Sequence, residues 1–144
     1  MLLSVRSRAL QGALWLNLAL LTLVFLLGMN INLYLAFPSN LPGALAMRSP
    51  SVQTHMIVAT LTLLVGLTAL VLSVIERHAW GIATTVAGVA LTLLAYGAGM
   101  TFVNAGYQES ASMLMAVGFI GAFIAYGLAI WTRGPRLAAA LAQR

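Results

Sequence analysis

Uncharged apolar stretches, separated by short polar segments, organise this chain. No Asp, Glu, Lys or Arg occurs at 9–37, 52–75, 79–103 or 111–132. The hydrocarbon core of a bilayer requires about 20 mostly apolar helical residues, and each stretch exceeds that length. Because backbone amides in lipid must be satisfied within the chain, runs of this kind are typical of transmembrane helices. The pattern predicts an all-α fold, a four-helix transmembrane bundle that occupies 1–144 as a single domain.

Small and polar residues recur every three or four positions in the last three predicted helices, which places them along one face of each helix. Small residues at this spacing allow membrane helices to approach closely. We therefore expect these faces to line the interior of the bundle, with most Leu and Val side chains toward lipid. The faces comprise His55, Ala59, Thr62, Gly66, Ala69 and Ser73, then Thr84, Gly88, Thr92, Ala95 and Gly99, then Met115, Gly118, Ala122, Ala125 and Ala129.

The arginines predict the orientation in the membrane. Basic residues concentrate in short cytoplasmic segments, so their distribution indicates which ends lie inside. Six arginines fall on one side of the predicted spans and only Arg48 falls on the other, which predicts a plasma-membrane protein with both termini in the cytoplasm. The net charge of +5 is then a topology signal and not a sign of nucleic-acid binding. The six are Arg6, Arg8, Arg77, Arg133, Arg136 and Arg144.

Composition excludes several kinds of chemistry. The chain is 62% hydrophobic and 6% charged, and it has no cysteine, so disulfides and thiolate metal sites are excluded. Its only acids are Glu76 and Glu109. No serine–histidine–acid set can be assembled from them, and neither acid falls inside a predicted span as in the usual proton-coupled exporters. The residues therefore assign no catalytic group.

His55 is the leading candidate for a site residue. It falls on the inward face of the second predicted helix, about one turn from the outer end. Neutral imidazole binds haem iron, copper and zinc, and a polar group inside a membrane bundle is often functional. The alternative is a ring that only bonds to a neighbouring carbonyl. Met115 is expected to point inward at a similar depth on the fourth helix.

The methionines form a second pattern, because all of them except the first fall in the predicted outer half or outer loop. Thioether sulfur binds copper in its reduced state and serves as an axial haem ligand beside histidine. Methionine also fills irregular gaps between helices. The candidates are thus His55 and Met115 for a cofactor, and His55, Met115 and Met113 for a metal ion. The outer methionines are Met29, Met47, Met56, Met100, Met113 and Met115.

The layout resembles one half of a haem A synthase, a family built from two four-helix bundles. The resemblance is carried by His55 in the segment 52–59, which follows an outer loop, and by the glycine-containing end of the third helix at 97–104. It implies binding of haem b with His55 as an axial ligand, and a role in oxidase biogenesis for the respiratory chain.

Two positions depart from that family. Ser-Met-Leu-Met at 112–115 replaces the segment in which the family has its second axial histidine, and Val52 stands where the family has an acid. The resemblance leaves two ligand sets, His55 with Met115 or one His55 from each copy of a homodimer. Oxidation of the haem methyl group would lack its acid.

Two other functions fit the same residues. The chain is alternatively a non-catalytic accessory or assembly subunit of a larger respiratory membrane complex, with its small-residue faces as docking surfaces, or a copper-handling protein. Arg48, Tyr107 and Glu109 fall together on the outer side, where they either surround a propionate or lipid headgroup or are simply solvated. In every case the bilayer is the expected surrounding partner.

Overall fold

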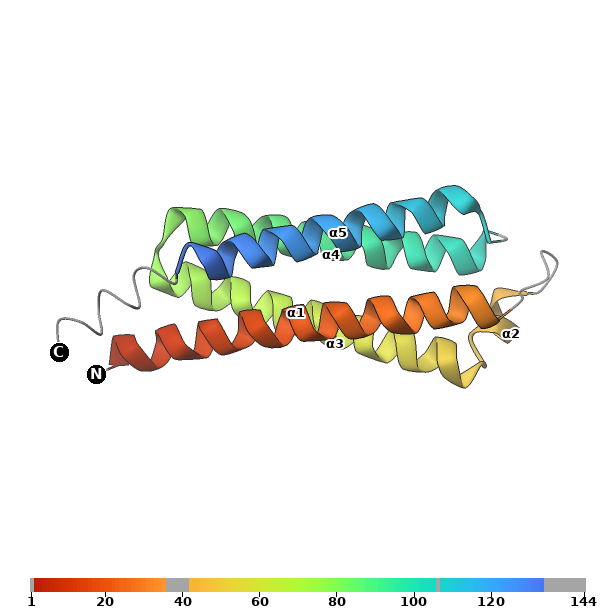
Figure 1. Cartoon of the computed structure of the whole chain (residues 1–144), viewed down its shortest axis with the longest axis horizontal. Helices are drawn as coiled ribbons and strands as arrows, with labels where there is room; N and C mark the ends of the chain where they lie inside the picture. The colour runs from red at the N-terminus through yellow and green to blue at the C-terminus, as the bar shows by residue number, and fades with distance from the viewer. Residues whose placement is uncertain (1, 36–41, 106, 134–144) are drawn as a thin grey trace.

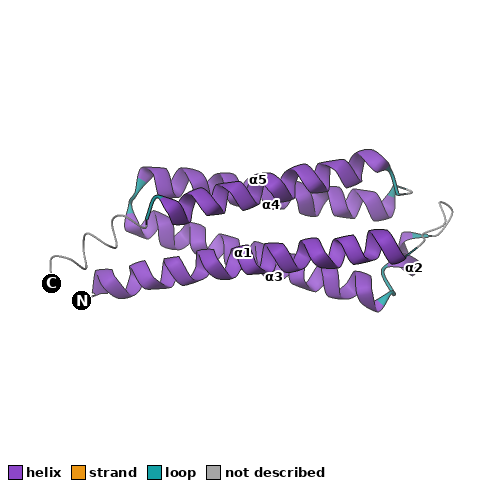
Figure 2. Ribbon diagram, viewed as in Figure 1, coloured by secondary structure: helices purple, strands orange, loops and turns teal. Residues whose placement is uncertain are grey.

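Four long helices and one short helix make up the structure, a computed structural model that describes residues 2–35, 42–105 and 107–133. Within these ranges there is no strand (Figures 1 and 2). The long helices are each long and apolar enough to cross a membrane, which confirms the all-helical class and the four predicted elements. The helices are α1 (Leu2–Tyr34), α2 (Gly43–Ala46), α3 (Pro50–Glu76), α4 (Ala79–Asn104) and α5 (Glu109–Trp131).

The predicted helix boundaries differ slightly from those observed. The first helix ends at Tyr34, and the predicted end at 37 lies outside the described residues. It begins at Leu2, seven residues before its uncharged stretch. α3 starts two residues earlier and ends one later than its stretch, α4 starts as predicted and ends one later, and α5 starts two residues earlier, at Glu109, and ends one earlier, at Trp131. A carboxylate in the first turn of a helix interacts favourably with the helix dipole, which explains why α5 starts there.

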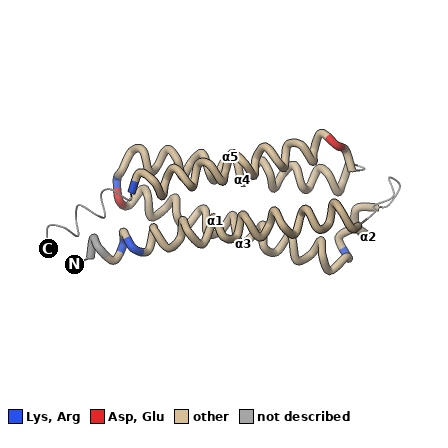
Figure 3. The backbone as a smooth tube through the Cα atoms, in the orientation of Figure 1, with Lys and Arg blue, Asp and Glu red and all other residues tan. Residues whose placement is uncertain are grey.

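The long helices form two antiparallel pairs, α1 with α3 and α4 with α5, and contacts between α3 and α4 and between α1 and α5 join the pairs (Figure 1). We call the end that holds the α3–α4 connection the charged end. The opposite end, which holds α2 and the α4–α5 connection, is the pocket end. Figure 3 shows the described charged residues confined to these two ends, so the length of each helix between them carries no charge.

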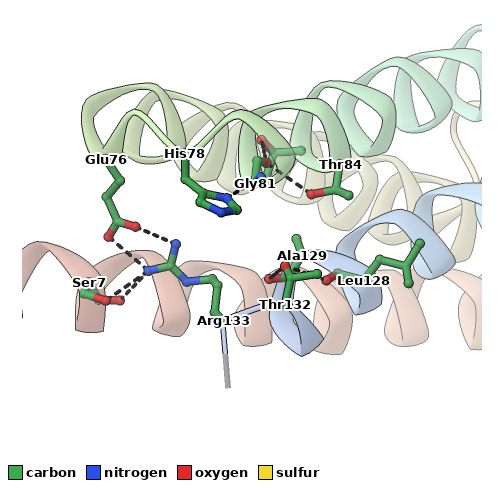
Figure 4. Close-up of polar contacts among 10 residues, drawn as sticks. Ser7, Glu76, His78, Gly81, Thr84, Leu128, Ala129, Thr132 and Arg133 are labelled. Atoms are coloured by element: carbon green, nitrogen blue, oxygen red, sulfur yellow. Dashed lines mark hydrogen bonds and ion pairs between the residues drawn. The ribbon is translucent and has the colours of Figure 1, made fainter. Parts of the chain in front are cut away.

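The tight connection between α3 and α4 has clear local causes. Arg77 adopts the left-handed conformation, with φ of 54°, a common way to end a helix. His78 then caps α4, because its Nδ1 accepts a hydrogen bond of 2.9 Å from the backbone N–H of Gly81 (Figure 4). These two residues reverse the chain between helices that lie side by side.

At the charged end, a buried ion pair ties three segments together (Figure 4). The Arg133 guanidinium donates to both carboxylate oxygens of Glu76, at 2.6 and 3.0 Å, and to the Ser7 hydroxyl at 3.0 Å. The side chains of Arg133 and Glu76 are only 10% and 17% exposed. Bidentate pairing of this kind is directional as well as strong. It joins α1, the end of α3 and the residues after α5.

The interior contains the small-residue faces predicted from the sequence. Thr62, Gly66, Ala69 and Ser73 of α3 are buried. The predicted small residues of α5 are also buried, and those of α4 are buried as far as Thr92, whereas Ala95 and Gly99 are half-buried. Large apolar side chains such as Ile57, which is 60% exposed, lie on the outside. Buried threonines satisfy their hydroxyls within their own helices, as when Thr62 donates to the carbonyl four residues earlier at 2.8 Å.

One residue from each long helix meets near the middle of the bundle, and we call this set the filled layer. It consists of Asn17, Gly66, Gly88 and Tyr126. Tyr126 and Asn17 are fully buried. A Cβ on Gly88 would lie 2.6 Å from the Tyr126 ring, and a Cβ on Gly66 would lie 2.5 Å from its hydroxyl. Both glycines are therefore required for the tyrosine to fill the space between the two pairs.

Candidate functional site: a cavity at the pocket end

A cavity of about 270 Å³ lies between the two helix pairs at the pocket end. Thr62 and Thr92 mark its deepest side, one helical turn from Gly66 and Gly88 of the filled layer. The residues that line it include no Asp, Glu, Lys or Arg. Its enclosed part is therefore suited to an uncharged group or to a metal held by neutral ligands.

His55 lines this cavity from α3. Its ring packs against α1, where a Cβ on Gly28 would lie 3.1 Å from Cε1 and 3.6 Å from Nδ1. Nδ1 is buried without a well-formed hydrogen bond to any described residue, and the backbone of Val24 interacts with the ring. A buried polar atom without a partner costs about 1–3 kcal/mol, so this histidine is not explained by packing alone.

Met115 lines the same cavity from α5, as its predicted depth and face required. Its sulfur lies against α4, where a Cβ on Gly99 would be 3.3 Å from Sδ. His55 and Met115 are therefore arranged alike, each from the second helix of a pair and each seated over a glycine of the first. We call Gly28, His55, Gly99 and Met115 the pocket layer.

The pocket layer and the filled layer are in register. Each pocket-layer residue is eleven positions from a filled-layer residue on the same helix (17 to 28, 66 to 55, 88 to 99 and 126 to 115). Eleven residues make about three turns and about 16 Å of rise, so the paired positions share a face. One layer is closed by Tyr126, whereas the other leaves the cavity open.

The methionines predicted for this half of the bundle converge, with one exception. Met113 is 71% exposed on the outer surface of α5 and does not line the cavity. It lies two positions from Met115, and residues at that spacing do not share a helical face. The structure brings His55 and Met115 together but leaves Met113 apart. The methionines that line the cavity are Met29, Met47, Met56, Met100 and Met115.

Aromatic side chains form part of the cavity lining. Phe25 of α1 stacks on Phe119 of α5 with ring centroids 4.8 Å apart, and both rings line the cavity. Tyr107, in the α4–α5 connection, also lines it and packs edge-on to Phe102 at 5.5 Å. Of the polar trio predicted at this end, only Tyr107 lines the cavity, because Arg48 and Glu109 are not among its lining residues.

The side chains that could bind a metal suit haem iron, but the volume of the cavity is small for a porphyrin. Imidazole and thioether are an established pair of axial ligands, and both side chains belong to the pocket layer. A volume of about 270 Å³ lies near the lower limit of small-molecule pockets, which span about 300–1,000 Å³. A porphyrin is too large for the cavity as it stands, and its binding would require the cavity to widen.

The fold and this cavity define a class, an all-helical bundle of four membrane-length apolar helices with a neutral, methionine-rich pocket at one end. Comparisons with protein-family models, with curated proteins and with solved structures find no match to this chain.

Proposed function

We propose that this protein is a haem-binding membrane protein of the haem A synthase type that serves oxidase biogenesis. The observation that carries the proposal is His55, an imidazole that lines a cavity together with Met115 while its Nδ1 edge is buried against Gly28 of α1. His55 and Met115 would hold the haem iron. Because His55 and Met115 line the same cavity of one copy, we favour a single copy as the source of both ligands over one His55 from each copy of a homodimer.

Haem b held in this way would supply a redox-active iron. The chain's own contribution would be to orient His55 and Met115 and to provide an uncharged, largely apolar lining around them. The lining residues contain no carboxylate that could accept a proton from a substrate. We therefore favour binding or electron transfer over oxidation of the haem methyl group.

The direct test is a visible absorption spectrum of the protein, purified in detergent from cells with adequate haem supply. We expect a Soret band, with sharp α and β bands on reduction, and its loss or displacement in His55→Ala. His78→Ala is the matched control, because His78 caps α4 at the charged end and its loss should leave the spectrum unchanged.

A featureless spectrum of the wild-type protein would overturn the haem proposal. The accessory-subunit interpretation would then predict co-purification of a stoichiometric larger complex from native membranes.

Copper handling is the second candidate, favoured by the five methionines that share the cavity with His55. Thioether and imidazole together suit Cu(I). We expect Met115→Leu to weaken Cu(I) binding, measured by competition with a chromogenic chelator. Met113→Leu is the control, because its side chain lies on the outer surface. Equal affinity in wild type and Met115→Leu would remove this candidate.

We also propose that the charged end faces the cytoplasm of a cell whose plasma membrane holds the bundle. Arg6, Arg8 and Arg77 are exposed at this end, and the exposed Trp15, Trp80 and Trp131 belong to the halves of their helices nearest to it, as expected for an interfacial belt. Since the chain lacks cysteine, single cysteines at Gln53 and Arg77 can be compared in whole cells. An impermeant thiol reagent should label the first and not the second; the reverse result would invert the orientation.

A further inference from the structure

The neighbours of His55 on α1 determine more than packing. In an α-helix, the carbonyl of residue 24 accepts the N–H of residue 28, so the Val24 carbonyl lies beside Gly28. That carbonyl has a second lone pair and lies close to the His55 ring. Nδ1 is buried on this side of the ring, 3.6 Å from where a Gly28 Cβ would stand. A Cβ at position 28 would lie 3.1 Å from Cε1, so alanine there would push the imidazole away from the α1 backbone by a few tenths of an ångström.

A carbonyl oxygen can only accept a hydrogen bond, so an imidazole nitrogen that interacts with it must carry the proton. In neutral histidine the other nitrogen then has a free lone pair. Histidines that bind metals commonly use this arrangement, in which one N–H donates to a carbonyl or carboxylate and the other nitrogen binds the metal.

We propose that Gly28 is a positioning residue of the site: by admitting His55 to the Val24 carbonyl, it places the proton on Nδ1 and leaves Nε2 free to bind a metal in the cavity. This inference rests on the proposed function, because the free Nε2 matters only if the cavity binds a metal. It applies whether that metal is haem iron or Cu(I). Its geometric content concerns the protein without any ligand.

The other histidine provides an internal reference. His78 Nδ1 accepts a hydrogen bond from the Gly81 N–H at 2.9 Å, so its proton lies on Nε2. The chain contains only two histidines, and the inference requires them to hold opposite tautomers. Protonated and unprotonated ring nitrogens have well-separated ¹⁵N chemical shifts, so a histidine-labelled sample reports both tautomers at once.

The experiment is ¹⁵N spectroscopy of the full chain in lipid nanodiscs without metal, well above the ordinary imidazole pKa of about 6.5. We expect His55 as the Nδ1–H tautomer and His78 as the Nε2–H tautomer. Gly28→Ala should move the His55 signals toward a mixture and leave His78 unchanged. Gly12→Ala is the matched control on the same helix, because a Cβ there would meet nothing within 4 Å.

The affinity for haem or Cu(I) is measured on the same variants. Loss of a partner that orients a metal-binding histidine typically lowers metal affinity by about 10–100-fold, and we expect a fall of that size for haem or Cu(I) in Gly28→Ala but not in Gly12→Ala. A His55 ring found as Nε2–H, or one indifferent to Gly28→Ala, would overturn the inference even if wild type binds metal. If wild type binds neither haem nor Cu(I) but His55 holds the Nδ1–H tautomer, the proposed function fails and the positioning by Gly28 stands.

Discussion

The filled layer and the pocket layer are built on the same four helices at equivalent positions, yet one is closed and the other is open. In the filled layer, α5 contributes Tyr126, whose ring crosses the bundle to Gly88 and Gly66. In the pocket layer, α5 contributes the slimmer Met115 at the corresponding position, and α3 contributes His55. Only the glycine of α4 is common to both layers, as Gly88 and Gly99, so the difference comes from the residues at the equivalent positions of the other three helices.

This difference suggests a division of labour along the bundle. The Arg133–Glu76 pair and the filled layer together hold the helix pairs against each other. Side chains that line a cavity lose contacts with one another, which reduces stability. A well-packed charged half offsets that loss in the pocket half. A functional site is more accurately positioned when it is supported by well-packed elements.

The comparison predicts that removing side chains will have unequal costs in the two layers. Truncation of a large buried aromatic residue costs about 3–5 kcal/mol, and we expect Tyr126→Ala to destabilise the protein by that amount. Met115→Ala enlarges an existing cavity and should cost less than half as much. Thermal unfolding of both variants in the same detergent measures the difference. Equal losses would show that the two layers contribute equally to stability.

A second prediction concerns the close approach of α4 and α5 between the two layers. A Cβ on Gly118 would lie 2.8 Å from both the Ala95 nitrogen and the Leu91 oxygen of α4, which are backbone atoms that cannot rotate away. Overpacking typically costs about 1–3 kcal/mol, so Gly118→Ala should lower thermal stability and shift Met115 relative to His55.

Gly127→Ala is the matched control on α5, since nothing lies within 4 Å of its Cβ position. Because alanine favours helix over glycine, this variant should be neutral or slightly stabilising. A Gly118→Ala protein as stable as Gly127→Ala would mean that the contact between these helices is looser than the structure indicates.

Much of this architecture follows from local sequence patterns. The uncharged stretches and the three- and four-residue spacing of small residues predicted the helices and their inward faces, and the same spacing placed Met115 with His55. Met113 was grouped with them on residue type alone, although its spacing from Met115 already indicated the opposite side of α5. In this case periodicity predicts a side chain's location better than chemical similarity.

The features that were not predicted depend on contacts between distant parts of the chain. Arg133 meets Glu76 and Ser7 across 57 and 126 positions, and no local pattern indicates which charges at a bundle end will pair. Tyr126 falls between Ala122 and Ala129 at helical spacing, so its inward face was readable, but its reach across the bundle depends on Gly66 and Gly88 of other helices. Gly28 likewise acquires its role only from the histidine opposite it.

The smallest expected effect tests whether the pocket layer can be converted into a second filled layer. Ala59 lines the cavity, and Ala59→Leu would place an isobutyl group in the space. Filling a cavity commonly stabilises a protein by about 0.5–2 kcal/mol, so we expect a modest rise in thermal stability together with loss of haem or Cu(I) binding. Ala90→Leu, on the exposed face of α4, should change neither property. If Ala59→Leu destabilises the protein, the cavity cannot hold even one added isobutyl group. The pocket layer would then be packed and not open.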